Sequence, residues 1–287
     1  SNADVTAYRA KRAGRARVEV FDDELRRQLS HSRRIARSVG RLLDLQHVPV
    51  LLTPIAELNT NQVVGFDCRV DWSEAGLEHD VELIERVVDE TGMSRALDLS
   101  LLRTAMTHLA AWQRQPPGPI VPGLSVALTR AGAVSPVLPE LVRECLGRSG
   151  VLPALCWIGI PESAVAEDLG AASRVVDALH ELGVGVALRD FGSGVSSLEH
   201  LRRLPTPTMT IAGPLVEAAR EGGDCADSAL LAAIVQYARA IGRIVVVLGV
   251  TDLAHAAHLR DLGCSFGSGP AFGPEVRPDG VADSFPA

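Results

Sequence analysis

The chain has 287 residues, of which 47% are apolar, and a formal net charge of −7, which suits one large domain and argues against nonspecific nucleic-acid binding. No run of about 18 apolar residues occurs, so we expect no membrane-spanning segment within it. The cysteines are odd in number and form no CxxC pair, which excludes a disulfide framework and a zinc site and indicates small core residues in a reducing, cytoplasmic compartment. They are Cys68, Cys145, Cys156, Cys225 and Cys264.

The first 21 residues are too few to form a domain. Ser1-Asn2-Ala3 is typical of an expression scar, and residues 8–21 (YRAKRAGRARVEVF) predict a short helix followed by a short strand. This piece is too small to bury an apolar face by itself. We therefore expect it to be the end of a preceding domain.

Residues 22–46 predict a linker helix. Asp22 is a candidate N-cap, and apolar residues follow it at helical spacing from Leu25 to Leu43. Six arginines give the helix a basic face. We interpret this face as solvated, because a single basic face without aromatic residues is a weak signal of nucleic-acid binding.

From His47 onward, strand-like and helix-like segments alternate. Near-continuous apolar runs predict strands buried on both faces. These strands are expected at residues 48–55, 62–70, 124–128, 155–160, 185–191, 208–212, 244–250 and 264–269. Helical spacing is clear at residues 80–90, 96–113, 139–146, 171–182, 228–241 and 253–262.

Eight strands joined mostly by helices predict an α/β fold, a TIM-like (β/α)8 barrel, with a doubly wound open sheet as the alternative. The first two strands are separated only by a short turn around Asn59-Thr60-Asn61, so one strand should run antiparallel to its neighbours. The segment after Pro274 is rich in Pro, Gly and Asp and is expected to be a loosely ordered tail.

Functional residues in a parallel barrel gather at the carboxyl ends of the strands. Asp67 and Asp190 are the obvious carboxylates at these ends, with Glu162 and Asp71 further away, whereas a two-metal hydrolase needs several converging carboxylates. Arg189, beside Asp190, would repel a cation. The glycine-rich turn after Asp190 fits either a phosphate cradle or, more commonly, a tight turn. Four histidines in amphipathic segments are expected at the surface: His180, His200, His255 and His258.

Four segments, in unbroken order over residues 48–275, resemble the EAL-domain cyclic-di-GMP phosphodiesterases of bacteria. VALRDFGSGVSSLEHLRRLP (186–205) resembles the family's DDFGTGYSSLxYLRxLP, and TPIAELNTNQVVGFDCRVDW (53–72) resembles QPIVDLxTGxVVGxEALLRW. LVRECLGRSGVLPALCWIGIPES (141–163) and VVVLGVTDLAHAAHLRDLGCSFGSGPAFGP (245–274) resemble the segments LLxxxGLxPxxLELEITES and VVAEGVETxxQLxxLRxLGCDxxQGYLFxxP.

The resemblance implies a domain organisation. Residues 47–275 would form the EAL barrel and residues 276–287 its tail. YRAKRAGRARVEVF is similar to the closing helix and strand of GGDEF diguanylate cyclase domains, so residues 1–21 would combine the expression scar with a GGDEF remnant. The full-length protein would then be a GGDEF-EAL tandem whose own GGDEF domain is a partner, and missing N-terminal regions could attach it to a membrane.

The resemblance also implies that the catalytic positions of the family are occupied by other residues. Of the metal-binding carboxylates, only Asp67, a shorter replacement for the glutamate of the EAL motif, and Asp190 remain. A charge reversal puts Asp71 at the position of the arginine that contacts substrate phosphate. The metal-binding glutamates, the first aspartate of DDFG and the lysine that orients the attacking water fall on Gly159, Leu248, Arg189 and Thr210. Three further polar positions fall on Ala127, Thr251 and Ser268.

These replacements predict a degenerate EAL domain without catalytic activity, acting as a regulatory or interaction module. The alternatives are a non-catalytic cyclic-di-GMP receptor and a residual phosphodiesterase. The family uses Mg²⁺ or Mn²⁺, and we expect neither to bind well and no other cofactor. We favour the absence of cyclic-di-GMP binding over its presence, because Asp71 would repel a phosphate where the family arginine attracts it. We expect a homodimer formed through an interaction loop. That loop consists of Asp190, Phe191, Gly192, Ser193, Gly194, Val195, Ser196 and Ser197.

Arg189 leads to a specific hypothesis about the vacated metal site. A guanidinium is permanently charged and can bind a carboxylate through two parallel hydrogen bonds. We therefore predict that Arg189 occupies or borders this site and pairs with Asp67, Asp190 or Asp71. The alternative is an Arg189 side chain that extends into solvent.

Overall fold

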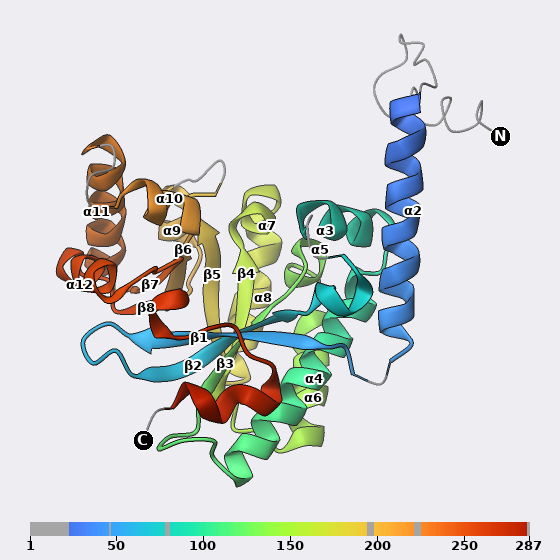
Figure 1. Cartoon of the computed structure of the whole chain (residues 1–287), viewed down its shortest axis with the longest axis horizontal. Helices are drawn as coiled ribbons and strands as arrows, with labels where there is room; N and C mark the ends of the chain where they lie inside the picture. Colours follow the sequence, from blue (N-terminus) through green and yellow to red (C-terminus); the bar gives the residue numbers. More distant parts are fainter. Residues whose placement is uncertain (1–22, 46, 78–80, 194–197, 221–224, 286–287) are drawn as a thin grey trace.

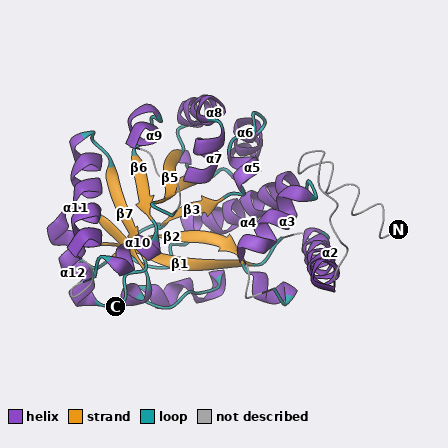
Figure 2. Cartoon of the chain, turned by 90° about the horizontal axis from the view of Figure 1, so that it is seen from above, coloured by secondary structure: helices purple, strands orange, loops and turns teal. Residues whose placement is uncertain are grey.

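The computed structural model describes residues 23–45, 47–77, 81–193, 198–220 and 225–285. Within them, the strands close into a barrel in sequence order, and the helices lie outside it (Figures 1 and 2). The strands are β1 (Val50–Glu57), β2 (Val63–Val70), β3 (Gly123–Ala127), β4 (Cys156–Pro161), β5 (Gly185–Phe191), β6 (Thr208–Ile211), β7 (Ile244–Leu248) and β8 (Phe266–Ser268).

β1 is antiparallel to both of its neighbours, β2 and β8, and all the other neighbouring strands are parallel. The predicted barrel with one reversed strand is therefore confirmed, and the open-sheet alternative is wrong. The reversal follows from the short connection between β1 and β2, because parallel neighbours need a crossover of a dozen or more residues.

The six helices with clear helical spacing are confirmed, with ends shifted by a few residues. They are α3 (Val81–Glu90), α4 (Ser94–Arg114), α6 (Leu138–Ser149), α8 (Leu169–Glu181), α11 (Cys225–Ala240) and α12 (Leu253–Leu262). The sequence did not reveal four helices of four to six residues, because such short helices show no periodicity. They are α5 (Arg130–Ala133), α7 (Glu162–Glu167), α9 (Leu198–Arg203) and α10 (Gly213–Ala218). Short 3₁₀ helices occur at Trp72–Ala75 (η1), Pro153–Leu155 (η2), Pro270–Phe272 (η3) and Pro278–Ser284 (η4).

Helix α2 (Asp23–Leu43) lies beside α3, and its N-terminal turns rise past that helix (Figure 1). Ile35, Val39 and Leu42 are buried and belong to the main hydrophobic core. Arg33 and Arg37 on another face are exposed, as the interpretation of a solvated basic face requires. The predicted GGDEF remnant and Asp22 lie outside the described residues.

Two expectations from composition can be compared with the structure. None of the described helices is both long and apolar enough to cross a membrane. The expected role of the cysteines as small core residues is confirmed for the described ones, which are free and buried: Cys68, Cys145, Cys156 and Cys264.

The expectation of a loosely ordered tail is wrong for the described residues 275–285. Val276 forms a β-bridge with Leu52, and η4 places Val281 in the core with 1% of its surface exposed. The ring of Phe285 packs edge-on against Phe66 at a centroid distance of 6.0 Å. Three apolar side chains therefore fix the segment, although its composition is that of a loop.

A buried carboxylate connects α4 to the loop that follows β3. Asp98 is 2% exposed and accepts hydrogen bonds from the Thr129 backbone N–H (2.9 Å) and hydroxyl (2.7 Å). Gly132 leaves room for it, because a Cβ at that position would lie 1.6 Å from a carboxylate oxygen of Asp98. Burial raises the pKa of Asp98 to about 7, although the hydrogen bonds from Thr129 oppose the change.

This pKa predicts a pH dependence of stability. Between about pH 4 and 7 the folded chain holds the Asp98 proton more tightly than the unfolded chain, so this group's stabilisation falls as pH rises through that window, by at most about 1.4 kcal/mol per pH unit. Asp98→Asn removes the titrating group and should flatten this dependence in urea unfolding measured from pH 4 to 8. Asp177→Asn, at an exposed position, is the control. An identical pH dependence in wild type and Asp98→Asn would contradict the assignment.

Candidate functional site

The carboxyl-terminal end of the parallel strands, called the mouth below, is closed by an ion pair. Arg189 on β5 and Asp67 on β2 meet across the barrel, with Nη1 to Oδ1 at 2.5 Å and Nη2 to Oδ2 at 3.0 Å. Their side chains are only 11% and 15% exposed. The prediction that Arg189 pairs with a mouth carboxylate is confirmed for Asp67, and the solvent-extended alternative is wrong.

The charges around Arg189 keep it ionised. Burial alone lowers the pKa of Arg189, but the carboxylates of Asp67 and Asp190 outweigh that effect and hold the pKa above its ordinary value. Asp190 is the more distant partner, with an oxygen 3.9 Å from Nε and a side chain that is 43% exposed. The guanidinium therefore carries a full positive charge at the position where the resemblance implies a metal-binding aspartate.

Gly159 on β4 makes room for the stem of this arginine. A Cβ built on Gly159 would lie 2.1 Å from Cδ and 2.9 Å from Cγ of Arg189. Real Cβ atoms do not approach other carbons this closely, so a side chain at position 159 and the observed conformation of Arg189 exclude each other. Gly159 and Arg189, at which the resemblance implies two metal-binding carboxylates, are thus sterically coupled.

Thr210 on β6 anchors the backbone of Asp190. Its hydroxyl accepts a hydrogen bond of 2.9 Å from the Asp190 N–H. Asp190 has a φ of 57°, in the left-handed region that aspartate tolerates better than most residues. Thr210 therefore holds the turn that leads into the interaction loop, of which residues 190–193 are described and residues 194–197 lie outside the described residues.

The Asp71 carboxylate is buried and hydrogen-bonded to other residues of this chain, so it does not face the mouth as a free charge. Its side chain accepts a hydrogen bond from the Ser73 N–H (3.1 Å) at the start of η1 and another from the Ser73 hydroxyl. Arg277 donates to it at 3.2 Å and also binds Glu74. The sequence analysis missed Arg277, because it lies in the segment expected to be loose.

A second arginine pair lies nearby on β2. Arg69 donates to both carboxylate oxygens of Glu275, at 2.7 and 2.6 Å, and the Thr53 hydroxyl donates to the same group at 3.0 Å. Both partners are about 40% exposed, so the pair contributes little stability by itself. It shows, however, that Glu275, which follows η3, contributes to the edge of the mouth.

Glu162, at the start of α7, lies against the interaction loop. It is 4% exposed and accepts a hydrogen bond of 3.3 Å from the Gly192 N–H. Nδ1 of His200 on α9 lies 4.0 Å from its other oxygen. Glu162 is therefore placed to position the loop and does not join the Arg189–Asp67 pair.

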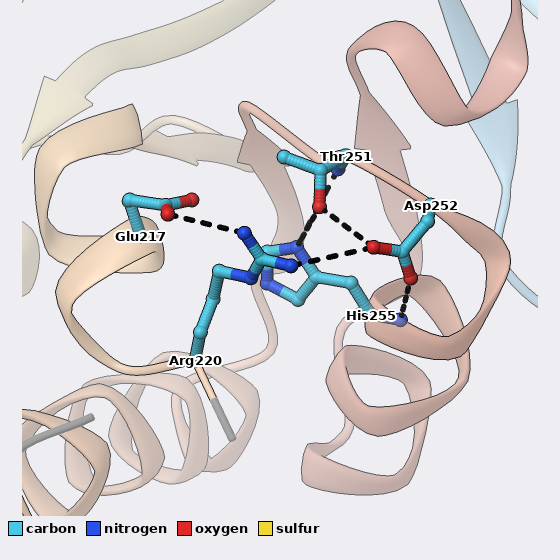
Figure 3. Close-up of polar contacts among 5 residues, drawn as sticks. All are labelled: Glu217, Arg220, Thr251, Asp252 and His255. Atoms are coloured by element: carbon cyan, nitrogen blue, oxygen red, sulfur yellow. Dashed lines mark hydrogen bonds and ion pairs between the residues drawn. The ribbon is translucent and has the colours of Figure 1, made fainter. Parts of the chain in front are cut away.

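Thr251 belongs to a polar network after β7 (Figure 3). Its hydroxyl donates to Asp252 (3.1 Å) and lies 3.3 Å from Nδ1 of His255, while Asp252 accepts from the His255 N–H (2.8 Å) and caps α12. Arg220 reaches Asp252 at 3.4 Å and Glu217 at 3.2 Å. The expectation of a surface His255 is wrong, because it is packed at the start of α12 with 7% of its surface exposed.

The remaining family positions show no charged groups. Leu248 is half-buried at the end of β7 and lines the barrel interior. Ala127 ends β3, and Ser268, 3% exposed, ends β8 with its carbonyl accepting from the Val250 N–H at 3.0 Å.

The donor set at the mouth does not fit a two-metal centre. Among the described residues, no three His, Cys, Asp or Glu side chains gather closely enough to hold a metal ion. Both oxygens of Asp67 accept from Arg189, and the guanidinium would repel a divalent cation placed beside it. We therefore derive no catalytic step through a metal at this site.

A closed, mostly parallel barrel with its first strand reversed and polar residues at the mouth defines a TIM-like α/β barrel with one antiparallel strand. The profile of the EAL domain family matches residues 36–275, and the chain belongs to this family.

Individual relatives agree with this assignment. The chain is 30% identical over 275 residues to an uncharacterized signaling protein of Caulobacter vibrioides, covering 95% of this chain and 33% of that protein. It is 24% identical over 266 residues to the bifunctional diguanylate cyclase/cyclic di-GMP phosphodiesterase MucR of Pseudomonas aeruginosa, covering 92% of this chain and 38% of MucR. The chain thus spans about a third of the length of these relatives.

The solved structure of the PaMucR phosphodiesterase, a complex with c-di-GMP, superimposes with a TM-score of 0.76 at 22% identity. The match covers 86% of this chain and 99% of that chain. At this identity the likeness shows the shared fold.

The steric coupling of Gly159 and Arg189 yields a prediction about stability. Gly159→Ala should lower the free energy of unfolding by about 1–3 kcal/mol, because the new methyl group overlaps the arginine stem. Gly123→Ala is a matched control on β3, since its Cβ would have no neighbour closer than 3.7 Å. Chemical denaturation measures both changes.

A double-mutant cycle tests whether the overlap with Arg189 causes this loss of stability. In an Arg189→Ala background, Gly159→Ala should cost much less than in the wild type. An equal cost in both backgrounds would show that the overlap with Arg189 is not the reason.

Proposed function

We propose that this chain is a non-catalytic EAL domain that acts as a regulatory or interaction module in cyclic-di-GMP signalling. The observation that carries the proposal is the bidentate ion pair between Arg189 and Asp67, which places a fixed positive charge at the mouth. The competing function is residual phosphodiesterase activity of the kind named for MucR.

The chemistry of phosphodiester hydrolysis supports this proposal. Two metal ions activate a water molecule and stabilise the attacking and leaving oxygens, and their binding needs converging carboxylates. Here Gly159, Thr210 and Leu248 offer neither a carboxylate nor an amine. Arg189 neutralises Asp67 without any metal, but a guanidinium of raised pKa is not a general base.

The charges at the mouth also disfavour a dinucleotide ligand. Asp71 is buried and paired with Arg277, so it offers a phosphate no positive charge, and Arg277 and Arg69 already bind carboxylates of this chain. A non-catalytic receptor for cyclic-di-GMP is therefore the less favoured version of the same proposal. Because the relative MucR is described as bifunctional and this chain spans about a third of it, we propose the full-length protein's own GGDEF domain as the partner.

We predict no turnover of cyclic-di-GMP. Purified protein with Mg²⁺ or Mn²⁺ should produce no linear dinucleotide above a buffer blank, because the described residues offer no cluster of three side chains that could hold a metal ion. Chromatographic separation of the nucleotides measures the product. Turnover that Asp190→Ala abolishes would contradict the proposal.

A charge-reversal variant of Arg189 tests whether the positive charge of this arginine prevents metal binding. Arg189→Asp removes the cation and adds a ligand beside Asp67 and Asp190, so it should bind Mg²⁺ or Mn²⁺ more tightly than wild type in calorimetric titration. It should still not hydrolyse cyclic-di-GMP, because Gly159, Thr210 and Leu248 are unchanged. The same titration with cyclic-di-GMP separates a silent module from a receptor.

We also propose that the module forms a homodimer through the interaction loop and α9. The described part of this region carries an exposed apolar side chain, Leu198, with 50% of its surface accessible, directly after the loop. An exposed leucine next to a turn held by Glu162 and Thr210 suits a contact between copies.

Light scattering tests the dimer. Leu198→Asp should convert dimers to monomers at micromolar concentration, because the contact would bury an unpaired charge. Leu152→Asp, at a 59% exposed position in the loop before β4, is the matched control and should leave the assembly unchanged. Arg37→Glu, on the exposed face of α2, tests for assembly through that helix without removing its core residues. A wild-type protein that is monomeric at high concentration would refute the proposal.

A further inference from the structure

The barrel interior contains a cavity that the mouth residues do not explain. Its volume is about 200 Å³, and the strands line it from their amino-terminal ends up to the Arg189–Asp67 pair. The walls are mainly apolar, with Ile55, Trp157, Ile244, Val246 and Phe266 among them.

The cavity exists because small residues stand at inward positions. Barrels of this kind are usually filled by bulky branched side chains from alternate positions of each strand. Here Gly123, Ser125 and Ala187 line the interior and leave it open. Gly185 is also required, because a Cβ there would lie 2.2 Å from the Trp157 ring. The amino-acid sequence of the strands therefore builds a hollow rather than a packed core.

The cavity faces the amino-terminal end of the barrel. Ile244, the first residue of β7, lines it and is 39% exposed, and Trp157 and Phe266 at the starts of their strands are half-buried. At the inner end, the Arg189 charge is already neutralised by Asp67. A ligand in this cavity would meet apolar walls and no unpaired charge, which favours a neutral molecule.

One polar group on the wall has no partner. Thr208 on β6 is 6% exposed, and its hydroxyl makes no hydrogen bond within the described residues. A buried hydroxyl without a partner costs about 1–3 kcal/mol. Rotation about the Cα–Cβ bond of Thr208 exchanges its methyl and hydroxyl positions, so the hydroxyl can turn to a ligand that offers a hydrogen-bonding group.

We propose that the amino-terminal end of the barrel binds a small neutral aromatic molecule with one hydroxyl group, of the phenol class. The size agrees, because an apolar cavity of about 150 Å³ holds benzene. The rings of Trp157 and Phe266 supply aromatic neighbours, and the Thr208 hydroxyl supplies the polar partner. The site lies on the amino-terminal side of the Arg189–Asp67 pair and does not depend on whether the domain is catalytic.

Three probes that share one benzene ring and differ in its substituent test the ligand class by calorimetric titration. Phenol and toluene should bind saturably, and benzoate should not, because its charge finds no free cation. Thr208→Val should weaken phenol binding at least tenfold and leave toluene binding unchanged, because it removes the hydroxyl and keeps the side-chain shape.

Filling the cavity provides the second test. Ala187→Leu should weaken the binding of phenol and toluene at least tenfold, whereas Ala240→Leu, on the exposed face of α11, should not. A cooperative melting transition confirms that each variant folds. If Ala187→Leu does not fold, the comparison of wild type with Thr208→Val still tests the proposal. Absence of saturable phenol binding up to its solubility, or affinity for phenol unaffected by Thr208→Val, would overturn the proposal.

Discussion

The arrangement of the mouth depends on the ion pair between Arg189 and Asp67. Both side chains are largely removed from water, so each requires the other, and losing one partner of such a pair typically costs about 3–5 kcal/mol. The pair also dictates its surroundings: Gly159 must lack a side chain because the arginine stem passes within the reach of any Cβ. Arg189, Asp67 and Gly159 thus form one interlocked unit, in which a change at one position affects the other two.

The same electrostatic principle extends to the C-terminal segment. Asp71 is buried with Arg277 as a partner, and Arg69 pairs with Glu275, so side chains after β8 neutralise charges on β2 and in the loop that follows it. The segment is held in place by apolar contacts of Val281 and Phe285. Its packing therefore makes it a structural part of the mouth, with arginines and carboxylates binding one another in place of an external ion.

The barrel derives its stability from its outer layer more than from its interior. Fully buried side chains on the strands, such as Leu124, Ile158, Val186 and Met209, alternate with the residues that line the cavity and belong to the core formed with the surrounding helices. This alternation leaves the interior positions free to vary. Small residues there open a hollow below the ion pair without removing the contacts that hold the helices to the sheet.

The sequence by itself determined the barrel, its strands and long helices, and the reversal of β1, because apolar runs, helical periodicity and a short turn are local signals. It also indicated Arg189 as a partner for a carboxylate at the mouth. Only the tertiary structure showed that the carboxylate bound by Arg189 is that of Asp67 and that Arg277 pairs with Asp71. It also showed that His255 is buried and that the C-terminal segment is packed against the barrel. These outcomes join residues that are up to 224 positions apart, as Leu52 and Val276 are, and such contacts depend on packing that no local pattern encodes.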